Sequence, residues 1–112
     1  MTLSLTNEEC AMKKLLDRET LAQCAPKLAE LTQQVLFDDI WQRGLLSPRE
    51  RSLLTLATLT ALGRVQQLQW HINYARQNGL TQDELVESFT HLAFCAGWPA
   101  AVTALSHLED NH

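Results

Sequence analysis

The stretch SPRERSLLTLATLTALG, residues 47–63, decides the fold of this chain. Ser47 has the side chain of a helix N-cap, Pro48 suits the first helical turn, and Glu50 stands where it closes a capping box. Gly63 supplies the left-handed residue that ends many helices. Beyond the first turn the segment is apolar except for threonines and one serine, which predicts a central helix buried on several sides.

The rest of the chain predicts more helices and no strands. No segment alternates apolar and polar residues with a period of two, and no tight hairpin turn joins β-branched runs. Helix start and stop signals predict helices over about residues 7–16, 26–44, 47–63, 65–77, 81–97 and 100–109. The sequence therefore predicts an all-α fold of about six helices.

Composition limits the classes of partner. The chain has 112 residues, 46% of them hydrophobic, which predicts one domain near the size at which oligomerisation adds burial. Nine scattered lysines and arginines against 13 acidic residues give no basic patch for nucleic acid. The uncharged stretch 52–63 is too short to span a bilayer, and the N-terminus does not resemble a signal peptide. We expect a cytoplasmic homo-oligomer without nucleic-acid or membrane partners.

The cysteines and histidines show no pattern of a disulfide framework or a metal site. Cys10, Cys24 and Cys95 are an odd number and contain no C-x-x-C pair, which predicts free thiols. No two of the four histidines have the close helical spacing of a zinc site. We expect neither a metal nor a cofactor.

Two histidines are candidates for acid–base chemistry. His71 falls on the apolar stripe of the helix expected over 65–77, where a partly desolvated imidazole either titrates near neutral pH or is a core histidine with a backbone partner. On the next helix Glu84, Glu87, Ser88, His91 and Cys95 form a polar strip, because they stand three or four residues apart. Glu87 precedes His91 by one turn and can orient its ring, as part of a second proton donor or of a structural ion pair.

Five short motifs follow one another along the chain: WQRGL at 41–45, RSL at 51–53, L-x-x-H at 68–71, NGLT at 78–81 and HLAFCAGWP at 91–99. Together they resemble the carboxymuconolactone decarboxylase family over residues 41–105, with residues 1–45 as N-terminal helices. This family shares its helical fold with alkylhydroperoxidase-like proteins. The resemblance implies a protomer that assembles into trimers or hexamers, with a small-molecule site lined by the helix that carries His71 and by its neighbours.

Departures from the pattern distinguish two branches of the superfamily. Antioxidant relatives carry a C-x-x-C pair before the histidine, where this chain has Arg64 and Gln67, so no dithiol is available for a peroxidase cycle. Decarboxylation of a carboxylated lactone or related organic acid needs no cofactor, because the substrate supplies its own electron sink. We expect such a lyase, with His71 as its acid–base residue. The alternatives are an antioxidant relative without the cysteine pair and a non-catalytic oligomer that binds a metabolite.

Further residues are expected at the binding site. Arg51 and Arg64 are candidate anchors for a carboxylate, since a guanidinium binds it through two parallel hydrogen bonds; the alternative for each is a solvated surface arginine. Trp41 and Trp98 are candidate pocket walls, although aromatic residues at helix ends also serve packing or subunit contacts. Cys95 stands where many relatives carry tyrosine, and a buried cysteine there is most often an inert small hydrophobe.

Overall fold

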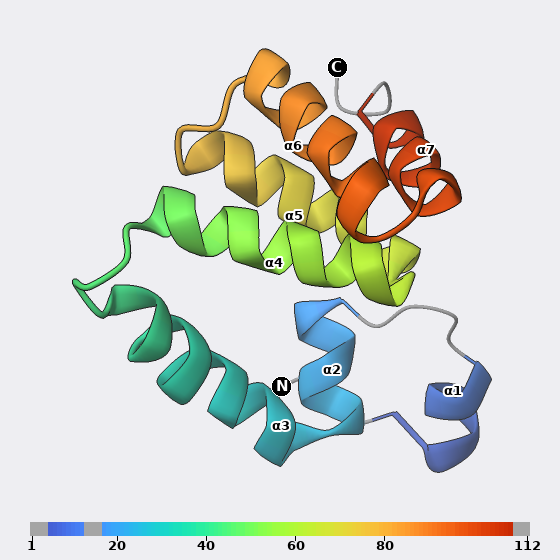
Figure 1. Ribbon diagram of the computed structural model, residues 1–112. Helices are drawn as coiled ribbons and strands as arrows, with labels where there is room; N and C mark the ends of the chain where they lie inside the picture. The colour runs from blue at the N-terminus through green and yellow to red at the C-terminus, as the bar shows by residue number, and fades with distance from the viewer. Residues whose placement is uncertain (1–4, 13–16, 109–112) are drawn as a thin grey trace. The chain divides into compact units, whose positions relative to one another are not determined.

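The computed structural model describes residues 5–12 and 17–108, which form seven α-helices and no strand (Figure 1). The predicted all-α class is confirmed, with one more helix than expected. The chain divides into two compact units, Met1–Arg43 and Gly44–His112. Within the described ranges, no helix combines the length and the apolar character needed to cross a membrane.

The N-terminal unit begins with three short helices: α1 (Asn7–Met12), α2 (Arg18–Cys24) and α3 (Pro26–Leu31). α2 lies outside the helices predicted from the sequence. Its start is fixed by a capping box in which the Asp17 carboxylate accepts from the Thr20 amide at 2.8 Å. In return, the Thr20 hydroxyl accepts from the Asp17 amide at 2.9 Å. The last four residues of the helix expected over 7–16 lie outside the described residues.

The single helix expected over 26–44 is wrong beyond α3. The chain continues as a π-helix, η1 (Thr32–Phe37), and then as a short 3-10 turn, η2 (Ile40–Gln42). The Asp38 amide donates to the carbonyl of Gln33 at 2.9 Å, five residues back, which is the spacing of a π-turn. The Gln33 side-chain amide also donates to the Asp38 carboxylate at 2.9 Å, so the wider turn gains a second bond between the same two residues.

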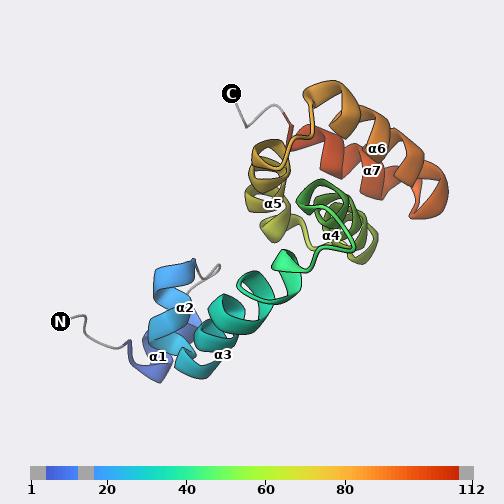
Figure 2. The same ribbon diagram turned by 90° about the vertical axis from the view of Figure 1, so that its left-hand side faces the viewer.

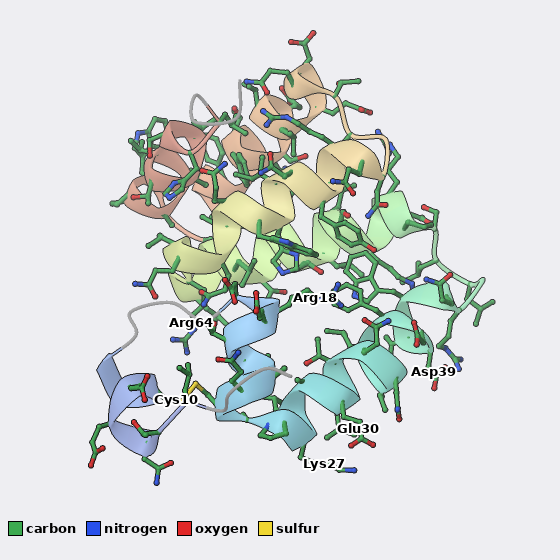
Figure 3. The ribbon with its side chains drawn as sticks, turned by 180° about the vertical axis from the view of Figure 1, so that it is seen from behind. Cys10, Arg18, Lys27, Glu30, Asp39 and Arg64 are labelled. Atoms are coloured by element: carbon green, nitrogen blue, oxygen red, sulfur yellow. A yellow bond between two sulfur atoms is a disulfide. The ribbon has the colours of Figure 1, made fainter. Side chains whose placement is uncertain are left out.

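A disulfide joins Cys10 of α1 to Cys24 at the end of α2, with a Cα–Cα distance of 5.8 Å (Figure 3). The expectation of three free thiols is therefore wrong for this pair, and Cys95 is the free cysteine. Spacing along the chain could not reveal the bond, because a disulfide depends on how the two helices lie in space.

The second unit contains four longer helices: α4 (Pro48–Leu62), α5 (Val65–Gln77), α6 (Gln82–Cys95) and α7 (Trp98–Ser106). α4 packs against α5, and α6 packs against α7 (Figure 2). α4 also contacts α6 and α7. The first three helices lie where the sequence predicts them. The fourth begins at Trp98, earlier than expected, because Pro99 fits its first turn rather than preventing it.

Capping boxes fix the starts of α4 and α6. The Ser47 hydroxyl accepts from the Glu50 amide at 3.1 Å, and the Glu50 carboxylate accepts from the Ser47 amide at 2.8 Å. Thr81 and Glu84 form the same pair of bonds at 3.1 and 3.0 Å. Gly63 ends α4 with a φ of 71°, in the left-handed region. Both predicted boxes and the predicted glycine stop are confirmed.

The core of the second unit lies among α4 to α7. Its largest fully buried side chains are Phe89, Leu56, Leu68, Ile72 and Leu85. On α4 the buried positions recur every four residues, at Ser52, Leu56 and Thr60, whereas Leu54 and Leu62 are 58% and 64% exposed. The prediction that this helix is buried on several sides is therefore confirmed only in part, because α5, α6 and α7 contact it while the side that carries Leu54 and Leu62 is exposed.

Candidate functional site

An open cavity of about 520 Å³ lies between α4 and α6. Part of its lining is apolar: Leu53 and Ala57 come from α4, Leu92 comes from α6, and Leu80 precedes α6. A volume of this size is typical of sites for small organic molecules.

The polar lining of the cavity comes from five side chains: Arg49 of α4, and Glu84, Glu87, Ser88 and His91 of α6. The four residues of α6 share one face because they stand three or four residues apart. Most of the predicted polar strip therefore lines the cavity. Cys95, the last member of the strip, is not among the lining residues.

Glu84 links the first turns of the two helices. One of its carboxylate oxygens accepts from the Thr81 amide at 3.0 Å, and the other forms an ion pair with Nη2 of Arg49. The side chains of Arg49 and Glu84 are 42% and 39% exposed, so water screens their attraction. The pair orients the guanidinium at the cavity, and the other nitrogens of Arg49 make no hydrogen bond to any residue that the structure describes.

Ser88 and His91 have partners within their own helix. The Ser88 hydroxyl donates to the carbonyl of Glu84 at 2.7 Å, so its proton is already engaged. Nε2 of His91 lies 3.5 Å from Sγ of Cys95, one turn further along α6. Within the described residues no hydrogen bond or ion pair joins His91 to Glu87, although both side chains line the same cavity.

His71 lies on α5, away from this cavity lining. Its side chain is half-buried, and its ring meets Trp70 edge-on with 4.8 Å between the ring centroids. Burial lowers the pKa of His71 below the ordinary value of 6.5, because desolvation disfavours the charged imidazole. The two predicted histidines therefore do not share the lining of one cavity.

The two predicted carboxylate anchors do not line the cavity either. Arg51 is a half-buried residue in the first turn of α4, where its carbonyl accepts from the Thr55 hydroxyl at 2.9 Å. Arg64 is the exposed residue before α5, at the position labelled in Figure 3. The cation of the cavity is instead Arg49, which was not among the predicted site residues.

The remaining predicted residues are dispersed. Trp41 belongs to the N-terminal unit and stacks on Phe37, with 6.2 Å between the ring centroids. Trp98 is 63% exposed and meets the Phe94 ring edge-on at 5.8 Å, outside the α4–α6 cavity. Cys95 is exposed, so its expected place as a buried hydrophobe is wrong.

A signal for Arg49 was present in the sequence. Arg49, Leu53 and Ala57 stand four residues apart and share one face of α4, which is the face that lines the cavity. Among the described residues no three side chains of the metal-ligating types gather in a possible metal site. The cavity thus places a guanidinium and an imidazole beside an apolar surface; a guanidinium is a group that can bind an anion, and an imidazole is one that can transfer a proton.

Comparison with known proteins gives the family of the chain. Residues 26–110 match the carboxymuconolactone decarboxylase family. The chain is 40% identical over 74 residues to 4-carboxymuconolactone decarboxylase of Acinetobacter baylyi, covering 66% of this chain and 55% of the relative. It is 33% identical over 76 residues to nitrosuccinic acid decarboxylase of Metarhizium robertsii, covering 68% and 53%. The chain spans about half the length of these curated relatives. Because the family match covers most of its residues, including all four helices of the second unit, this chain belongs to the carboxymuconolactone decarboxylase family.

Proposed function

We propose that this protein is a cofactor-independent decarboxylase of a small carboxylated lactone or a related organic acid. The observation that carries the proposal is the α4–α6 cavity, where Arg49 and His91 face an apolar lining. The two relatives, both decarboxylases by name, support the reaction class.

The reaction requires little from the protein beyond charge balance and one proton. The bond between carbon and the carboxylate breaks, CO2 leaves, and the electron pair passes into a lactone carbonyl or a nitro group of the substrate. A proton then adds to carbon. The reacting carboxylate carries a charge of −1, which passes to the enolate or nitronate when CO2 leaves and is neutralised when the proton adds to carbon. Arg49 is the fixed cation that stabilises this charge at each stage.

His91 is the proposed proton donor. Its imidazole lines the cavity, and an imidazole can both donate and accept a proton at neutral pH. Glu87 lies in the same lining. His71 and Arg51 are the alternative candidates for the same two roles, and substitutions at the two histidines distinguish the alternatives.

An antioxidant function has less support. Cys95 is an exposed thiol, but Cys10 and Cys24 are joined to each other, and these are the only other cysteines of the chain. A peroxidase cycle that passes through a resolving cysteine therefore lacks a free partner thiol.

We also propose that the protein is a homo-oligomer, a trimer or a hexamer. Six large apolar side chains of the second unit are more than half exposed: Leu45, Leu54, Leu62, Phe94, Trp98 and Val102. Exposed apolar surface of this kind is typical of subunit interfaces. Light scattering at micromolar concentration tests the proposal, and the mass of a monomer would contradict it.

The experiment for the reaction measures CO2 release by the purified protein from a panel that includes 4-carboxymuconolactone and nitrosuccinic acid. His91→Asn keeps a polar side chain but removes the titrating ring, so we expect kcat to fall about a hundredfold with KM within about threefold. Arg49→Met should mainly raise KM. His107→Asn, a histidine outside the cavity, is the matched control and should retain full activity.

Two results would contradict this proposal at different levels. Release of CO2 that survives His91→Asn but is lost in a folded His71→Asn variant would move the chemistry to α5. No CO2 from any carboxylated substrate in the panel would refute the decarboxylase assignment itself.

A further inference from the structure

We propose that Cys95 is a positioning residue for His91. Its thiol engages Nε2 of the imidazole, so the ring acts on a ligand in the α4–α6 cavity through Nδ1. The inference rests on the proposed function for the role of the cavity, but it concerns one hydrogen bond and one ring nitrogen, and both are measured without turnover.

One nitrogen of the His91 ring already has a neighbour. Sγ of Cys95 lies 3.5 Å from Nε2, within the range of a hydrogen bond that involves sulfur. The two residues stand four apart on α6, which brings their side chains together on one face of the helix. Nδ1 makes no hydrogen bond to any residue that the structure describes. Cys95 therefore occupies one side of the ring and leaves the other available.

The lining of the cavity shows which nitrogen is left for a ligand. His91 lines the cavity, whereas Cys95, one turn further along α6, does not. Nε2 thus faces a residue outside the lining. The two nitrogens lie on different edges of the ring, so a partner at Nε2 does not block Nδ1. The nitrogen that contacts a ligand is therefore Nδ1.

The direction of the bond decides what Nδ1 offers. A neutral imidazole carries one ring proton, so one nitrogen donates and the other accepts. An imidazole nitrogen is much more basic than the sulfur of a thiol, so the bond is stronger when the thiol donates to Nε2. The ring proton then lies on Nδ1, which donates into the cavity. The protonated ring carries a proton on each nitrogen, and it delivers the one on Nδ1 to carbon.

A hydroxyl in place of the thiol would bond elsewhere. Four hydroxyl side chains of α4 and α6 donate to the carbonyl four residues back, at distances between 2.7 and 2.9 Å: Thr55, Thr58, Ser88 and Thr90. Cys95 instead places its sulfur against the ring one turn back. In Cys95→Ser the new hydroxyl should follow the other four and donate to the carbonyl of His91. This substitution should therefore release the ring, as Cys95→Ala does.

The first measurement is the tautomer of His91, read from nitrogen chemical shifts of the ring at a pH where titration shows it to be neutral. We expect the Nδ1–H tautomer to predominate in the parent protein. In Cys95→Ala and Cys95→Ser the Nε2–H tautomer, which free histidine favours, should predominate. Thr90→Ala is the matched control, because it removes a small exposed polar group of α6 outside the cavity lining, and it should leave the tautomer unchanged. All three variants should keep their fold, since both positions are exposed.

The second measurement is the binding of 2-furoate, a small ring that carries a carboxylate, by isothermal titration calorimetry. In the parent protein the ligand should shift the signal of Nδ1 more than that of Nε2. In Cys95→Ala the tautomer that donates into the cavity becomes the minor one, so Kd should rise by the inverse of its fraction, about threefold or more. Thr90→Ala should bind 2-furoate as the parent does.

The outcomes separate this inference from the proposed function. A parent ring in the Nε2–H form, a tautomer that does not respond to Cys95→Ala, a ligand shift confined to Nε2, or no binding of 2-furoate would overturn the inference. The expected tautomer and binding without CO2 release from any substrate would support the inference while the decarboxylase proposal failed. Release of CO2 that depends on His91, from a protein whose ring is in the Nε2–H form, would have the opposite meaning.

Discussion

Replacing Glu84 with alanine should destabilise the second unit more than any other exposed change on α6. The substitution removes three interactions at once. The Thr81 amide loses its acceptor at 3.0 Å, Arg49 loses its ion-pair partner, and the first turn of α6 loses a negative charge. Each of these interactions acts at a helix N-terminus.

The expected magnitude follows from these three parts. The hydrogen bond contributes about 0.5–1.5 kcal/mol. The half-exposed ion pair contributes about 0.2–1 kcal/mol, and the charge near the positive end of the helix dipole contributes about 0.3–1 kcal/mol. Together they predict a loss of about 1–3.5 kcal/mol, which at ~4–8 °C per kcal/mol lowers Tm by roughly 4–28 °C. Glu84→Gln keeps an acceptor suited to the capping box, so it should lose only about half as much.

Thermal and urea unfolding followed by circular dichroism measure these differences. Glu87→Ala is the control, since it removes the same charge one turn later without removing a cap or an ion pair, and should stay within about 0.5 kcal/mol of the parent. A double-mutant cycle of Glu84→Ala with Arg49→Met should give a coupling of about 0.2–1 kcal/mol. If Glu84→Ala were as stable as Glu87→Ala, the reasoning that links the two N-termini through Glu84 would be refuted.

Three further predictions concern the core, one titrating group and the disulfide. Phe89→Ala, at a side chain with 0% exposure, should lower the free energy of unfolding in urea by about 3–5 kcal/mol. Phe94→Ala, at 78% exposure, should lower it by less than about 1 kcal/mol. Equal losses would contradict the assigned core. Burial lowers the pKa of His71, so the unfolded chain takes up its proton more readily than the folded one, and stability should decline as pH falls through the ordinary value of 6.5 toward the lower folded pKa. His71→Gln should remove that part of the pH dependence. If the slope of stability against pH were unchanged in this variant, His71 would not be its cause. Alkylation of the denatured protein without reductant should label one of the three cysteines, with all three labelled after reduction; three labels without reductant would exclude the bond between Cys10 and Cys24.

The helices that the sequence predicts well are those whose ends depend on short-range chemistry. The boxes at Ser47 and Thr81 each involve residues three apart, so they are readable without knowledge of the fold. α2 was not predicted because its capping box has the acidic residue, Asp17, at the N-cap and the hydroxyl residue, Thr20, three positions later, whereas the usual box has them in the opposite order. The π-turn depends on Gln33 bonding to Asp38, a choice that apolar periodicity does not reveal.

The residues of the candidate site likewise fall into those that helical spacing predicts and those that depend on how the helices pack. The polar strip of α6 was predictable, because the positions of Glu87 and His91 relative to each other follow from helical spacing alone. Helical spacing places Arg49 on the same face of α4 as Leu53 and Ala57, but it does not show that α6 packs beside that face, so the contribution of Arg49 to the site could not be predicted. His71 was proposed from its place on the apolar stripe of its helix and then from family resemblance, and neither shows which helices enclose a cavity.

The two sides of the cavity belong to different helical hairpins, and this has a consequence for how the protein is assayed. α4 pairs with α5 and α6 pairs with α7, each across a short turn, so most backbone hydrogen bonds and many apolar contacts are local in sequence. The cavity exists only where one hairpin docks on the other. A variant that weakens docking alone would keep most of its helical circular dichroism while losing ligand binding. Helix content therefore measures whether the hairpins are present, whereas the environment of the His91 ring measures whether the site has been assembled.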